Sequence, residues 1–256
     1  MLDRLIEPYY RSPDNQVVLY LGDMREVLPA LKGLQADCIV TDPPYAETSL
    51  AWDRWPNDWP SIAATVTSSM WCFGSMRTFL DRAPEFAAWR LSQDIVWEKH
   101  NGSNFARDRF RRVHEHALHW YRGPWRDIYH EVPRVASTGR HQGGPAAAHS
   151  SPAHTGAITP QTWTDDGTRL VRSVIAARSM NHSAIHPTEK PIGGLLEHLI
   201  AYACPPGGLV LDPFAGSGST LDAARQSGRR AIGIESHEPY AAAAARRLAQ
   251  LTFPAA

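Results

Sequence analysis

The sequence has no long hydrophobic run, although hydrophobic residues make up 43% of its 256 positions. A membrane-spanning helix needs about 18 or more consecutive apolar residues, and no stretch of this chain is that long. The first 20 residues also lack the pattern of a signal peptide. We therefore expect no membrane span and no secretion, and we predict a cytoplasmic protein.

Cysteine is scarce as well. The three cysteines, Cys38, Cys72 and Cys204, lie far apart inside apolar segments and have no zinc-site spacing. They are interpreted as buried thiols in a reducing compartment. His114, His116 and His119 have no cysteine or carboxylate at ligand spacing, so they are interpreted as strand and surface residues, and no metal is predicted.

The chain also lacks a net charge, because 26 Lys and Arg balance 26 Asp and Glu. Nucleic-acid binding needs cations, so the distribution of charge matters more than its sum. Residues 99–140 contain nine Lys or Arg, five His and only four acids. This concentration is compatible with a side that faces nucleic acid, and equally with a solvated surface.

Periodic patterns indicate the fold class. Strand-like apolar runs occur at residues 17–21, 38–41, 70–73, 94–97, 117–121, 209–211 and 231–234. Helix-like stretches occur at residues 24–31, 76–89, 192–203, 219–226 and 239–251. Short apolar strands separated by helices predict an α/β fold with a doubly wound, mostly parallel sheet. Since no helical pattern separates 94–97 from 117–121, these strands are predicted to form an antiparallel hairpin at one edge.

One segment interrupts the alternation. Residues from about 123 to 181 are rich in Gly, Pro, Ser, Thr and His and have no sustained period. A loop of this length in a compact domain is usually functional or partly disordered. We interpret it as an insertion that carries specificity or becomes ordered when a partner binds.

A glycine-rich turn follows a strand-like run in "LVLDPFAGSGSTLDAA". Asp212 ends the run, Gly216 and Gly218 let a ligand approach the backbone, and a helix is expected near Ser219. The N–H groups at the start of that helix favour an anionic group. Glu235 ends the next predicted strand and is placed to accept two hydrogen bonds from a ribose. These features predict a site for a nucleoside-bearing cofactor.

Small details of this turn select the cofactor. A dinucleotide fingerprint needs a third glycine where the chain has Leu221, and no P-loop sequence is present. Together with the preceding carboxylate, Phe214 and Glu235, the turn fits S-adenosylmethionine, whose methionine carboxylate can sit at the turn.

The second informative stretch is "IVTDPPYAET", in which an apolar run gives way to Asp42, Pro43, Pro44 and Tyr45. This "DPPY" and the later "DPFAGSGST" resemble the amino-methyltransferases that modify DNA bases at an exocyclic nitrogen. "YLGDMREVLPAL" and "HPTEKP" also match that family. With "DPPY" first and the cofactor turn near the C-terminus, the order is similar to the β group, a circular permutation of the common methyltransferase order.

The resemblance implies a single methyltransferase domain over residues 1–256, in a prokaryotic or phage-encoded protein. It places Asp23 near the cofactor adenine, although this residue can also cap a helix. It also implies that Thr188 and Lys190 contact the cofactor. The full predicted cofactor set is Asp23, Thr188, Lys190, Asp212, Phe214, Gly216, Gly218, Ser219 and Glu235.

The "DPPY" turn suits the chemistry that the resemblance implies. The lone pair of an exocyclic amine is delocalised into the base, so the nitrogen is a poor nucleophile. The Asp42 carboxylate and the Pro43 carbonyl can each accept one N–H and direct the lone pair toward the sulfonium methyl group. Pro43 and Pro44 stiffen the turn, and the Tyr45 ring offers a surface on which an extruded base can stack.

The target is predicted to be adenine N6 in double-stranded DNA, because the resembling family more often combines Asp at the first motif position with adenine. Cytosine N4 is the alternative. A catalytically silent DNA-binding or regulatory protein, and methylation of RNA or of a polypeptide amide, also remain open. The sequence leaves open a homodimer and a cognate restriction endonuclease as partners.

Three tryptophans follow the "DPPY" turn in a stretch without an obvious regular element. Trp52, Trp55 and Trp59 can belong to a mobile loop that closes over the extruded base, or they can pack the loop onto the sheet. We expect at least one ring in each role.

Overall fold

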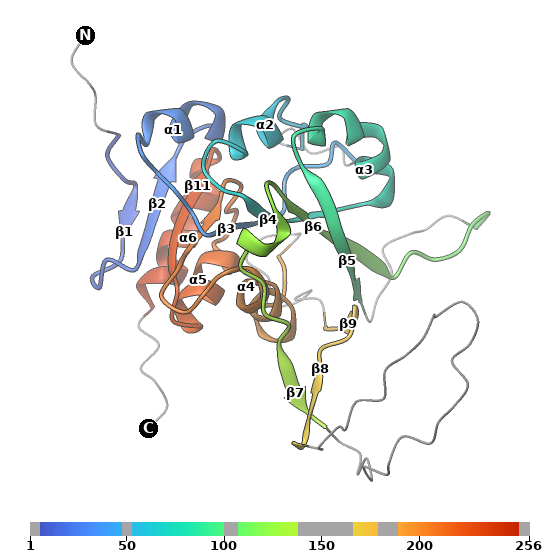
Figure 1. Cartoon of the computed structure of the whole chain (residues 1–256). Coiled ribbons are helices and arrows are strands. Elements are labelled where there is room, and N and C mark those ends of the chain that lie inside the picture. The colour runs from blue at the N-terminus through green and yellow to red at the C-terminus, as the bar shows by residue number, and fades with distance from the viewer. Residues whose placement is uncertain (1–5, 48–52, 100–106, 138–165, 179–188, 251–256) are drawn as a thin grey trace, which may run out of the picture. The chain divides into compact units, whose positions relative to one another are not determined.

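The computed structural model describes residues 6–47, 53–99, 107–137, 166–178 and 189–250. The chain divides into two compact units (Figure 1). The first comprises Met1–Glu131 and Arg172–Ala256, and the second comprises Val132–Val171. The expectation that the chain acts as a single methyltransferase domain stays a prediction.

In the described part of the first unit, nine strands form one sheet in the order β1-β2-β11-β10-β3-β4-β6-β5-β9. Their bounds, in sheet order, are Tyr10–Arg11, Val17–Leu21, Arg230–Glu235, Leu209–Asp212, Cys38–Thr41, Ser69–Gly74, His114–Tyr121, Arg90–Glu98 and Val174–Ala176. The five strands from β2 to β4 run parallel to one another. The predicted mostly parallel sheet is confirmed.

The antiparallel hairpin is also confirmed. Strands β5 and β6 pair antiparallel, and β6 pairs antiparallel with β4, so the hairpin extends the parallel core. The short strand β9, which the sequence patterns did not indicate, pairs with the outer side of β5.

Helices cover both faces of the sheet (Figure 1). On one face lie α1 (Met24–Ala30), α2 (Trp59–Ala63) and α3 (Met76–Arg82), and on the other lie α4 (Glu197–Ala203), α5 (Ser219–Gln226) and α6 (Glu238–Ala249). Side chains of a strand alternate between the two faces. Successive apolar residues of one strand therefore pack into two different cores, one on each face of the sheet. The core beneath α1 and α2 contains Ile39, Met70, Leu211 and Ile234.

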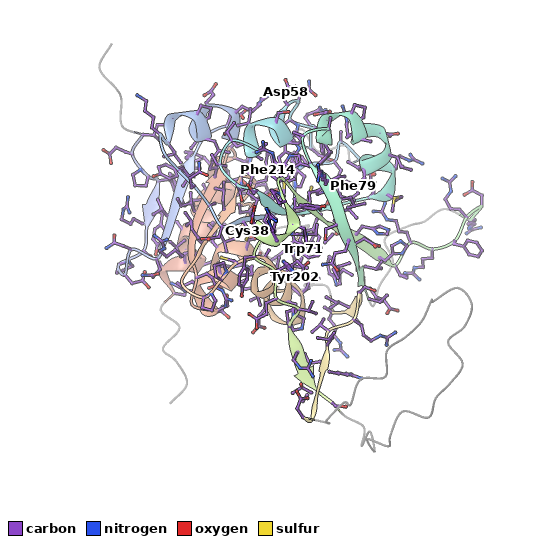
Figure 2. The ribbon with its side chains drawn as sticks, viewed as in Figure 1. Cys38, Asp58, Trp71, Phe79, Tyr202 and Phe214 are labelled. Atoms are coloured by element: carbon purple, nitrogen blue, oxygen red, sulfur yellow. The ribbon has the colours of Figure 1, made fainter. Side chains whose placement is uncertain are left out.

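Large aromatic side chains fill these two layers. Trp71, Phe79 and Tyr202 are buried and Phe214 is partly buried between the ribbons (Figure 2), and all three cysteines are buried free thiols, as predicted. Among the described residues, no helix is long and apolar enough to cross a membrane.

Two predicted helices are shorter than their sequence patterns suggested. Helix α3 ends at Arg82, because Pro84 cannot supply the backbone N–H that its continuation needs, and a single 3₁₀ turn, η1 (Ala83–Phe86), follows. Before α4, the segment η3 (Ile192–Leu196) is irregular, because Gly193 has ψ 135° and Gly194 has φ 77°.

The tryptophan-rich stretch is more ordered than expected. Helix α2 begins at Trp59, which is fully buried, and Trp55 packs edge-on against it with ring centroids 5.9 Å apart. The Trp55 indole N–H donates to both Glu85 carboxylate oxygens at 2.9 Å. Trp55 and Trp59 thus belong to the core, and Trp52 lies outside the described residues.

The second unit contains a short antiparallel pair of strands, β7 (Arg134–Ala136) and β8 (Thr168–Leu170). The Arg134 guanidinium pairs with Asp166 at 3.1 Å and donates to the Thr168 hydroxyl at 2.6 Å. The segment from about 123 to 181 therefore includes β7, β8, β9 and a short 3₁₀ turn, η2 (Trp125–Asp127), in its described parts.

Candidate functional site

The site lies where four neighbouring parallel strands end. In sheet order β2, β11, β10 and β3, the chain places an acid at or just after each carboxyl end: Asp23, Glu235, Asp212 and Asp42. Ligands of doubly wound sheets bind in the crevice outside these carboxyl ends, beside the point where the strand order reverses. Asp23 and Glu235, 212 positions apart in sequence, are thereby brought to one edge.

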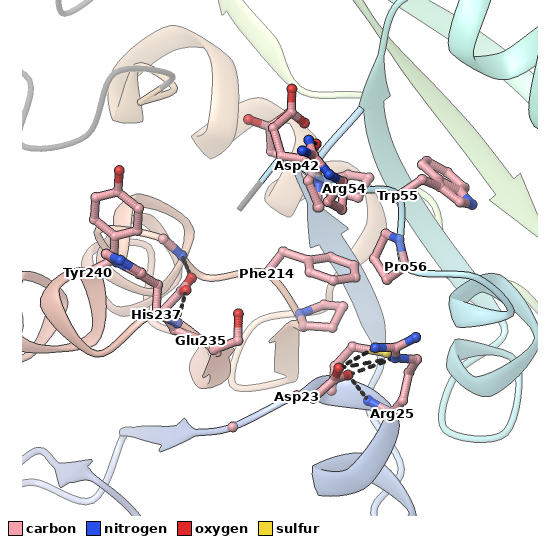
Figure 3. A pocket seen from close by; sticks show the side chains of 18 of the residues that line it. Asp23, Arg25, Asp42, Arg54, Trp55, Pro56, Phe214, Glu235, His237 and Tyr240 are labelled. Atoms are coloured by element: carbon pink, nitrogen blue, oxygen red, sulfur yellow. Dashed lines mark hydrogen bonds and ion pairs between the residues drawn. The ribbon is translucent and has the colours of Figure 1, made fainter. Parts of the chain in front are cut away.

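A cavity of about 450 Å³ opens along this edge (Figure 3). That volume suits a ligand of nucleoside size. Its walls combine carboxylates with proline and aromatic rings. The lining residues include Gly22, Asp23, Asp42, Pro43, Pro44, Tyr45, Trp55, Phe214, Gly216, Glu235, His237 and Tyr240.

Glu235 is held in place by the backbone around the glycine-rich turn. Its two carboxylate oxygens accept the N–H of Gly216 at 2.8 Å and the N–H of His237 at 2.7 Å. Burial raises the pKa of Glu235, and these hydrogen bonds oppose that shift. A carboxylate has about four acceptor positions, so two remain for a ligand.

Asp23 has two functions in the structure. It caps α1 by accepting the Arg25 N–H at 2.9 Å, and it forms an ion pair with the Arg25 side chain at 2.5 Å (Figure 3). Both residues also line the cavity. The capping interpretation is therefore correct, and the cap positions the Asp23 carboxylate at the cavity wall.

Asp212 faces a smaller cavity of about 50 Å³ that lies against the larger one and shares Asp42, Phe214 and Gly216 with it. The Asp212 Oδ1 atom accepts the Thr41 hydroxyl at 2.7 Å and the Phe214 N–H at 3.1 Å. Burial raises the pKa of Asp212 to about 6 despite these hydrogen bonds.

Gly218 does not line either of these cavities. It precedes α5 with φ 81°, and a Cβ atom there would lie 3.0 Å from the Ala244 Cβ of α6. Close packing in the turn also involves Gly233, where a Cβ would lie 2.5 Å from Leu221 Cδ1. Leu221 therefore fills the space that a glycine on strand β11 leaves open.

The Asp42 carboxylate, at the end of β3, is bonded on both oxygens. Tyr45 donates its hydroxyl to Oδ1, and Lys190 donates its ammonium to Oδ2. Burial raises the pKa of Asp42, which the Lys190 charge opposes, and burial raises the pKa of Tyr45 well above its ordinary value. Tyr45 is therefore a donor toward Asp42 near neutral pH.

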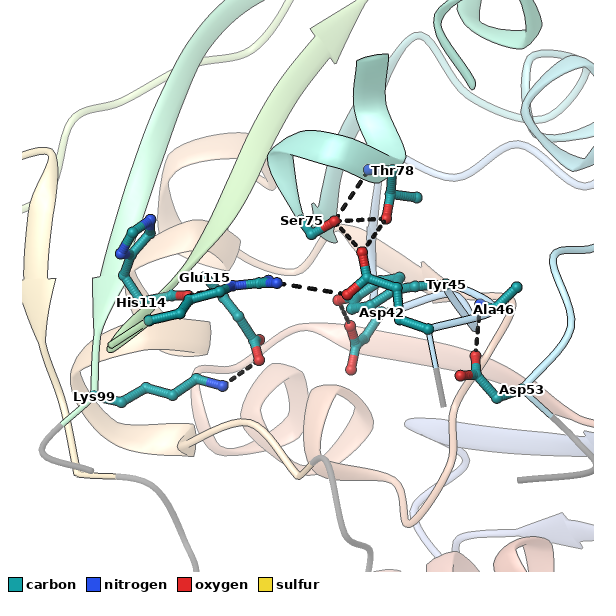
Figure 4. A network of polar contacts seen from close by, with 11 residues as sticks. Asp42, Tyr45, Ala46, Asp53, Ser75, Thr78, Lys99, His114 and Glu115 are labelled. Atoms are coloured by element: carbon teal, nitrogen blue, oxygen red, sulfur yellow. Dashed lines mark hydrogen bonds and ion pairs between the residues drawn. The ribbon is translucent and has the colours of Figure 1, made fainter. Parts of the chain in front are cut away.

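An ionic network continues from Asp42 through Lys190 to Glu115 and Lys99, and Figure 4 shows the ion pair between Lys99 and Glu115. The Lys190 ammonium lies 3.3 Å from a Glu115 oxygen, and Lys99 forms a further ion pair with Glu115. Burial acts to raise the pKa of Glu115, but the charges of Lys190 and Lys99 outweigh it and lower the pKa to about 2. Although burial acts to lower the pKa of Lys190, Asp42 and Glu115 keep it raised.

Two further acids hold the segment after "DPPY". The buried Asp53 accepts the Ala46 N–H at 2.8 Å, where Ala46 has the left-handed φ of 58°. Glu47 accepts hydroxyl hydrogen bonds from Ser75, the cap of α3, and from Thr78 at 3.2 Å. Asp53, Ser75 and Thr78 surround this segment in Figure 4.

On its other side, Tyr45 lines a cavity of about 910 Å³ with a basic wall. The cations and histidines of this wall are Arg77, Arg82, Arg109, Arg112, His114 and His116. Tyr45 thus separates the cavity beside the carboxyl edge from a basic cavity.

The predicted residues are partly assembled. Asp23, Asp42, Pro43, Pro44, Tyr45, Phe214, Gly216 and Glu235 line the larger edge cavity, and Lys190, Asp212 and Ser219 line the smaller one. The Ser219 hydroxyl accepts a hydrogen bond from Arg247 at 2.9 Å. Thr188 lies outside the described residues. The roles of all these residues stay predictions.

Sequence reasoning missed several residues of the site. Glu115 and Lys99 come from paired strands, and Asp53 and Tyr240 carry no motif, so no local pattern indicates them. It also misplaced one histidine, because His119 is fully buried and lies 3.0 Å from the Ser69 hydroxyl. In the described residues, no group of three His, Cys, Asp or Glu can hold a metal ion.

An acidic, ring-lined cavity at the carboxyl edge of a doubly wound sheet, with an Asp-Pro-Pro-Tyr turn on its rim, is typical of an enzyme that binds a nucleoside-bearing cofactor. The sequence matches the DNA methylase family N6_N4_Mtase over residues 36–246. The chain belongs to this family, as its resemblance to β-group amino-methyltransferases predicted. The cofactor of the family is S-adenosylmethionine, also as predicted.

Individual proteins agree with this assignment. The type II methyltransferase M.ScaI of Streptomyces caespitosus is 26% identical over 270 residues, which cover 94% of this chain and 84% of M.ScaI. YubD of Escherichia coli K12 is 59% identical over 64 residues, and this match covers 25% of this chain and only 28% of YubD.

Two solved structures share the fold. The M1.HpyAVI–SAM complex superposes with a TM-score of 0.63 at 24% identity, covering 90% of this chain and 99% of that chain. The cytosine-N4-specific PvuII DNA methyltransferase superposes with a TM-score of 0.64 at 16% identity, covering 98% and 91%.

Proposed function

We propose that this DNA methyltransferase transfers a methyl group from S-adenosylmethionine to N6 of adenine in double-stranded DNA. The observation that carries the proposal is the position of the "DPPY" turn. Asp42 and Tyr45 line the cavity that suits the cofactor, and Tyr45 also lines the basic cavity on its other side. A base entering from the basic side would meet Tyr45, and Asp42 lies beyond it on the wall of the cofactor cavity.

Residues around the larger edge cavity would hold the cofactor. Glu235 retains acceptor positions for ribose hydroxyls, Asp23 and Phe214 lie on the wall for the nucleoside, and Gly216 presents no side chain to it. S-adenosylmethionine supplies the methyl group when bound. The M1.HpyAVI–SAM structure shows that a protein of similar fold binds this cofactor, which supports the assignment here.

The Asp42 carboxylate can exchange one partner for the substrate. Each of its oxygens accepts a hydrogen bond from a side chain of this chain, Tyr45 or Lys190. An entering amine can take the place of the Tyr45 hydroxyl at Asp42 Oδ1, and the freed ring then becomes available to stack on the base. Asp42 and the Pro43 carbonyl then accept the two N–H groups, and Asp42 takes one proton after the nitrogen has been methylated.

Mass spectrometry of nucleosides from unmethylated DNA, incubated with the protein and S-adenosylmethionine, tests the proposal. We expect N6-methyladenine, and an Asp42→Ala sample should contain none. N4-methylcytosine would retain the chemistry and replace the target, since cytosine presents the same two N–H groups. Absence of any methylated base, with cofactor binding demonstrated, would contradict the proposal and favour a regulatory role.

The basic cavity is the proposed approach of the duplex, and Phe110 is its most exposed aromatic residue. Phe110 lines this cavity, is 99% exposed, and stands between arginines that can contact phosphates. An apolar side chain of this kind can fill the space that an extruded base leaves in the duplex.

We expect Phe110→Ala to lower the rate on a paired target about tenfold or more and to leave cofactor affinity unchanged. With a mispaired target base, which is extruded at lower cost, the rate should recover toward wild type. Leu80→Ala, which removes a 69% exposed side chain of α3 outside the cavity, is the matched control. Equal loss on paired and mispaired DNA would contradict the role of Phe110. Single-turnover assays on a mapped site measure both rates.

The cytoplasmic location, a homodimer and a cognate restriction endonuclease stay predictions. M.ScaI is named a type II methyltransferase, which supports a search for a neighbouring endonuclease. Sedimentation of the full chain with and without a DNA duplex would decide the oligomeric state.

A further inference from the structure

Glu115 is a largely buried acid that no motif of the sequence identifies, yet it contacts Lys190, the cation that is paired with Asp42. It lies on β6, two strands from the end of β3 where Asp42 lies, and its side chain is 15% exposed. Lys190, which is 5% exposed, bridges the two carboxylates. The three groups form a chain in which one ammonium serves two acids.

Lys190 is also enclosed by aromatic rings. Its ammonium lies 5.0 Å from the ring centroid of Phe73 and 5.9 Å from that of Trp97. Ring faces attract a cation within about 6 Å and limit its access to water. The ammonium lies between Asp42 and Glu115, and both acids contribute to its position.

Without Glu115, the Lys190 ammonium would shift toward Asp42. An ammonium with a single carboxylate partner in a desolvated site binds that partner more tightly, because the attraction is no longer divided. Asp42 would then hold Lys190 firmly and would be a weaker acceptor for an N–H group of the substrate.

We propose, on the basis of the proposed methyl transfer, that Glu115 is a positioning residue. It shares the Lys190 ammonium with Asp42 and so leaves Asp42 able to accept the N–H of the target amine. Lys99, which directly follows β5, supports Glu115 by a second ion pair. Glu115 lines neither the cavity beside the carboxyl edge nor the basic cavity, so it acts on Asp42 through the shared Lys190 ammonium and through its own charge.

The charges around Asp42 give the direction of the effect. The titratable groups facing this network are Tyr45 beside β3, Cys72 on β4, Lys99 just after β5, Glu115 on β6, Lys190 before α4 and Asp212 on β10. Glu115 raises the pKa of Asp42 and Lys190 lowers it. Methyl transfer needs ionised Asp42, so activity falls as the pH drops through that pKa.

The test is the pH dependence of single-turnover methyl transfer in two variants. Glu115→Gln should lower the maximal rate roughly fivefold to tenfold. It should also move the acidic limb of the rate–pH profile, where the rate falls as Asp42 becomes protonated, to lower pH. Lys190→Met should move the same limb to higher pH. Cofactor affinity of Glu115→Gln should stay within about twofold of wild type, because Glu115 does not line the cofactor cavity.

A structural role alone would not produce these opposite shifts. Asp222→Asn removes another buried carboxylate, paired with Arg225 at 3.5 Å on α5, and should change stability without moving the limb. An acidic limb that is unchanged in Glu115→Gln would overturn the proposal while leaving the methyltransferase function intact.

A second readout separates the two conclusions. Carbon-13 NMR titration of the Asp42 carboxyl group needs no turnover, and Glu115→Gln should lower its pKa. An unchanged titration overturns the positioning role even if the wild-type protein methylates no DNA, whereas missing methylation alone contradicts the proposed function.

Discussion

Asp42→Ala is expected to reduce the rate of methyl transfer by about a thousandfold or more and to leave S-adenosylmethionine affinity nearly unchanged. The substitution removes the carboxylate that accepts an N–H of the target amine and later takes its proton. The cofactor retains Asp23, Phe214 and Glu235, which lie on other strands and loops of the cavity. Single-turnover kinetics and calorimetric titration with the cofactor measure the two quantities.

Two variants show whether this loss comes from chemistry or from misfolding. In Asp42→Ala the Lys190 ammonium keeps Glu115 at 3.3 Å as a partner, so the buried cation does not become unpaired. Asp42→Asn keeps one hydrogen-bond acceptor but cannot take a proton, and it should retain some activity above that of Ala. Asp222→Asn should remain active. An Asp42→Ala protein that transfers methyl groups near the wild-type rate, or that is inactive only because it no longer binds the cofactor, would overturn the assigned role.

Gly216→Leu is expected to have the opposite effect, with cofactor affinity lost by about a hundredfold or more while the fold persists. Gly216 has φ 52° and lines both edge cavities, and its N–H donates to Glu235 at 2.8 Å. A leucine side chain would extend from the turn that the cofactor must approach. The left-handed backbone alone would cost roughly 1–2 kcal/mol of stability.

A second variant, Gly228→Leu, distinguishes the effect of backbone strain on cofactor affinity from the effect of a side chain that blocks the cavity. Gly228 also has a left-handed φ, 73°, but it lies outside the cavities, and nothing lies within 4 Å of its Cβ position. Gly228→Leu should therefore lose similar stability in thermal unfolding and bind the cofactor normally. If both variants lose affinity equally, strain rather than obstruction is responsible. Calorimetric titration of both proteins with S-adenosylmethionine, beside thermal melts, distinguishes the cases.

Two of the four carboxylates at the edge, Glu235 and Asp42, differ in the groups that bind them, and this difference explains their expected roles. Glu235 is bound by backbone N–H groups alone, which fix its direction and leave acceptor positions open. Asp42 is bound by two side chains that can move, a phenol and an ammonium. A ligand can displace a side chain without unfolding a turn, so Asp42 suits exchange of partners and Glu235 suits a fixed contact.

The family, the cofactor and the mostly parallel character of the sheet follow from the sequence alone. Most apolar runs of strand length are followed by a helical period, which predicts a parallel sheet, and Asp42, Asp212 and Glu235 end or follow such runs and are expected at its carboxyl edge. These are local properties, because a run, its breaker and its terminal acid adjoin in the chain.

Which side chains meet across that sheet follows from the three-dimensional fold and not from local sequence patterns. Thr41 bonds to Asp212, Lys190 bridges Asp42 and Glu115, and the contacts span up to 171 positions. They depend on strand order and register, which apolar periodicity does not encode. The same reason explains why the core position of Trp59 was not predictable. A contact between distant segments exists only after the backbone has folded, and its energy is then decided by burial and charge at that one place.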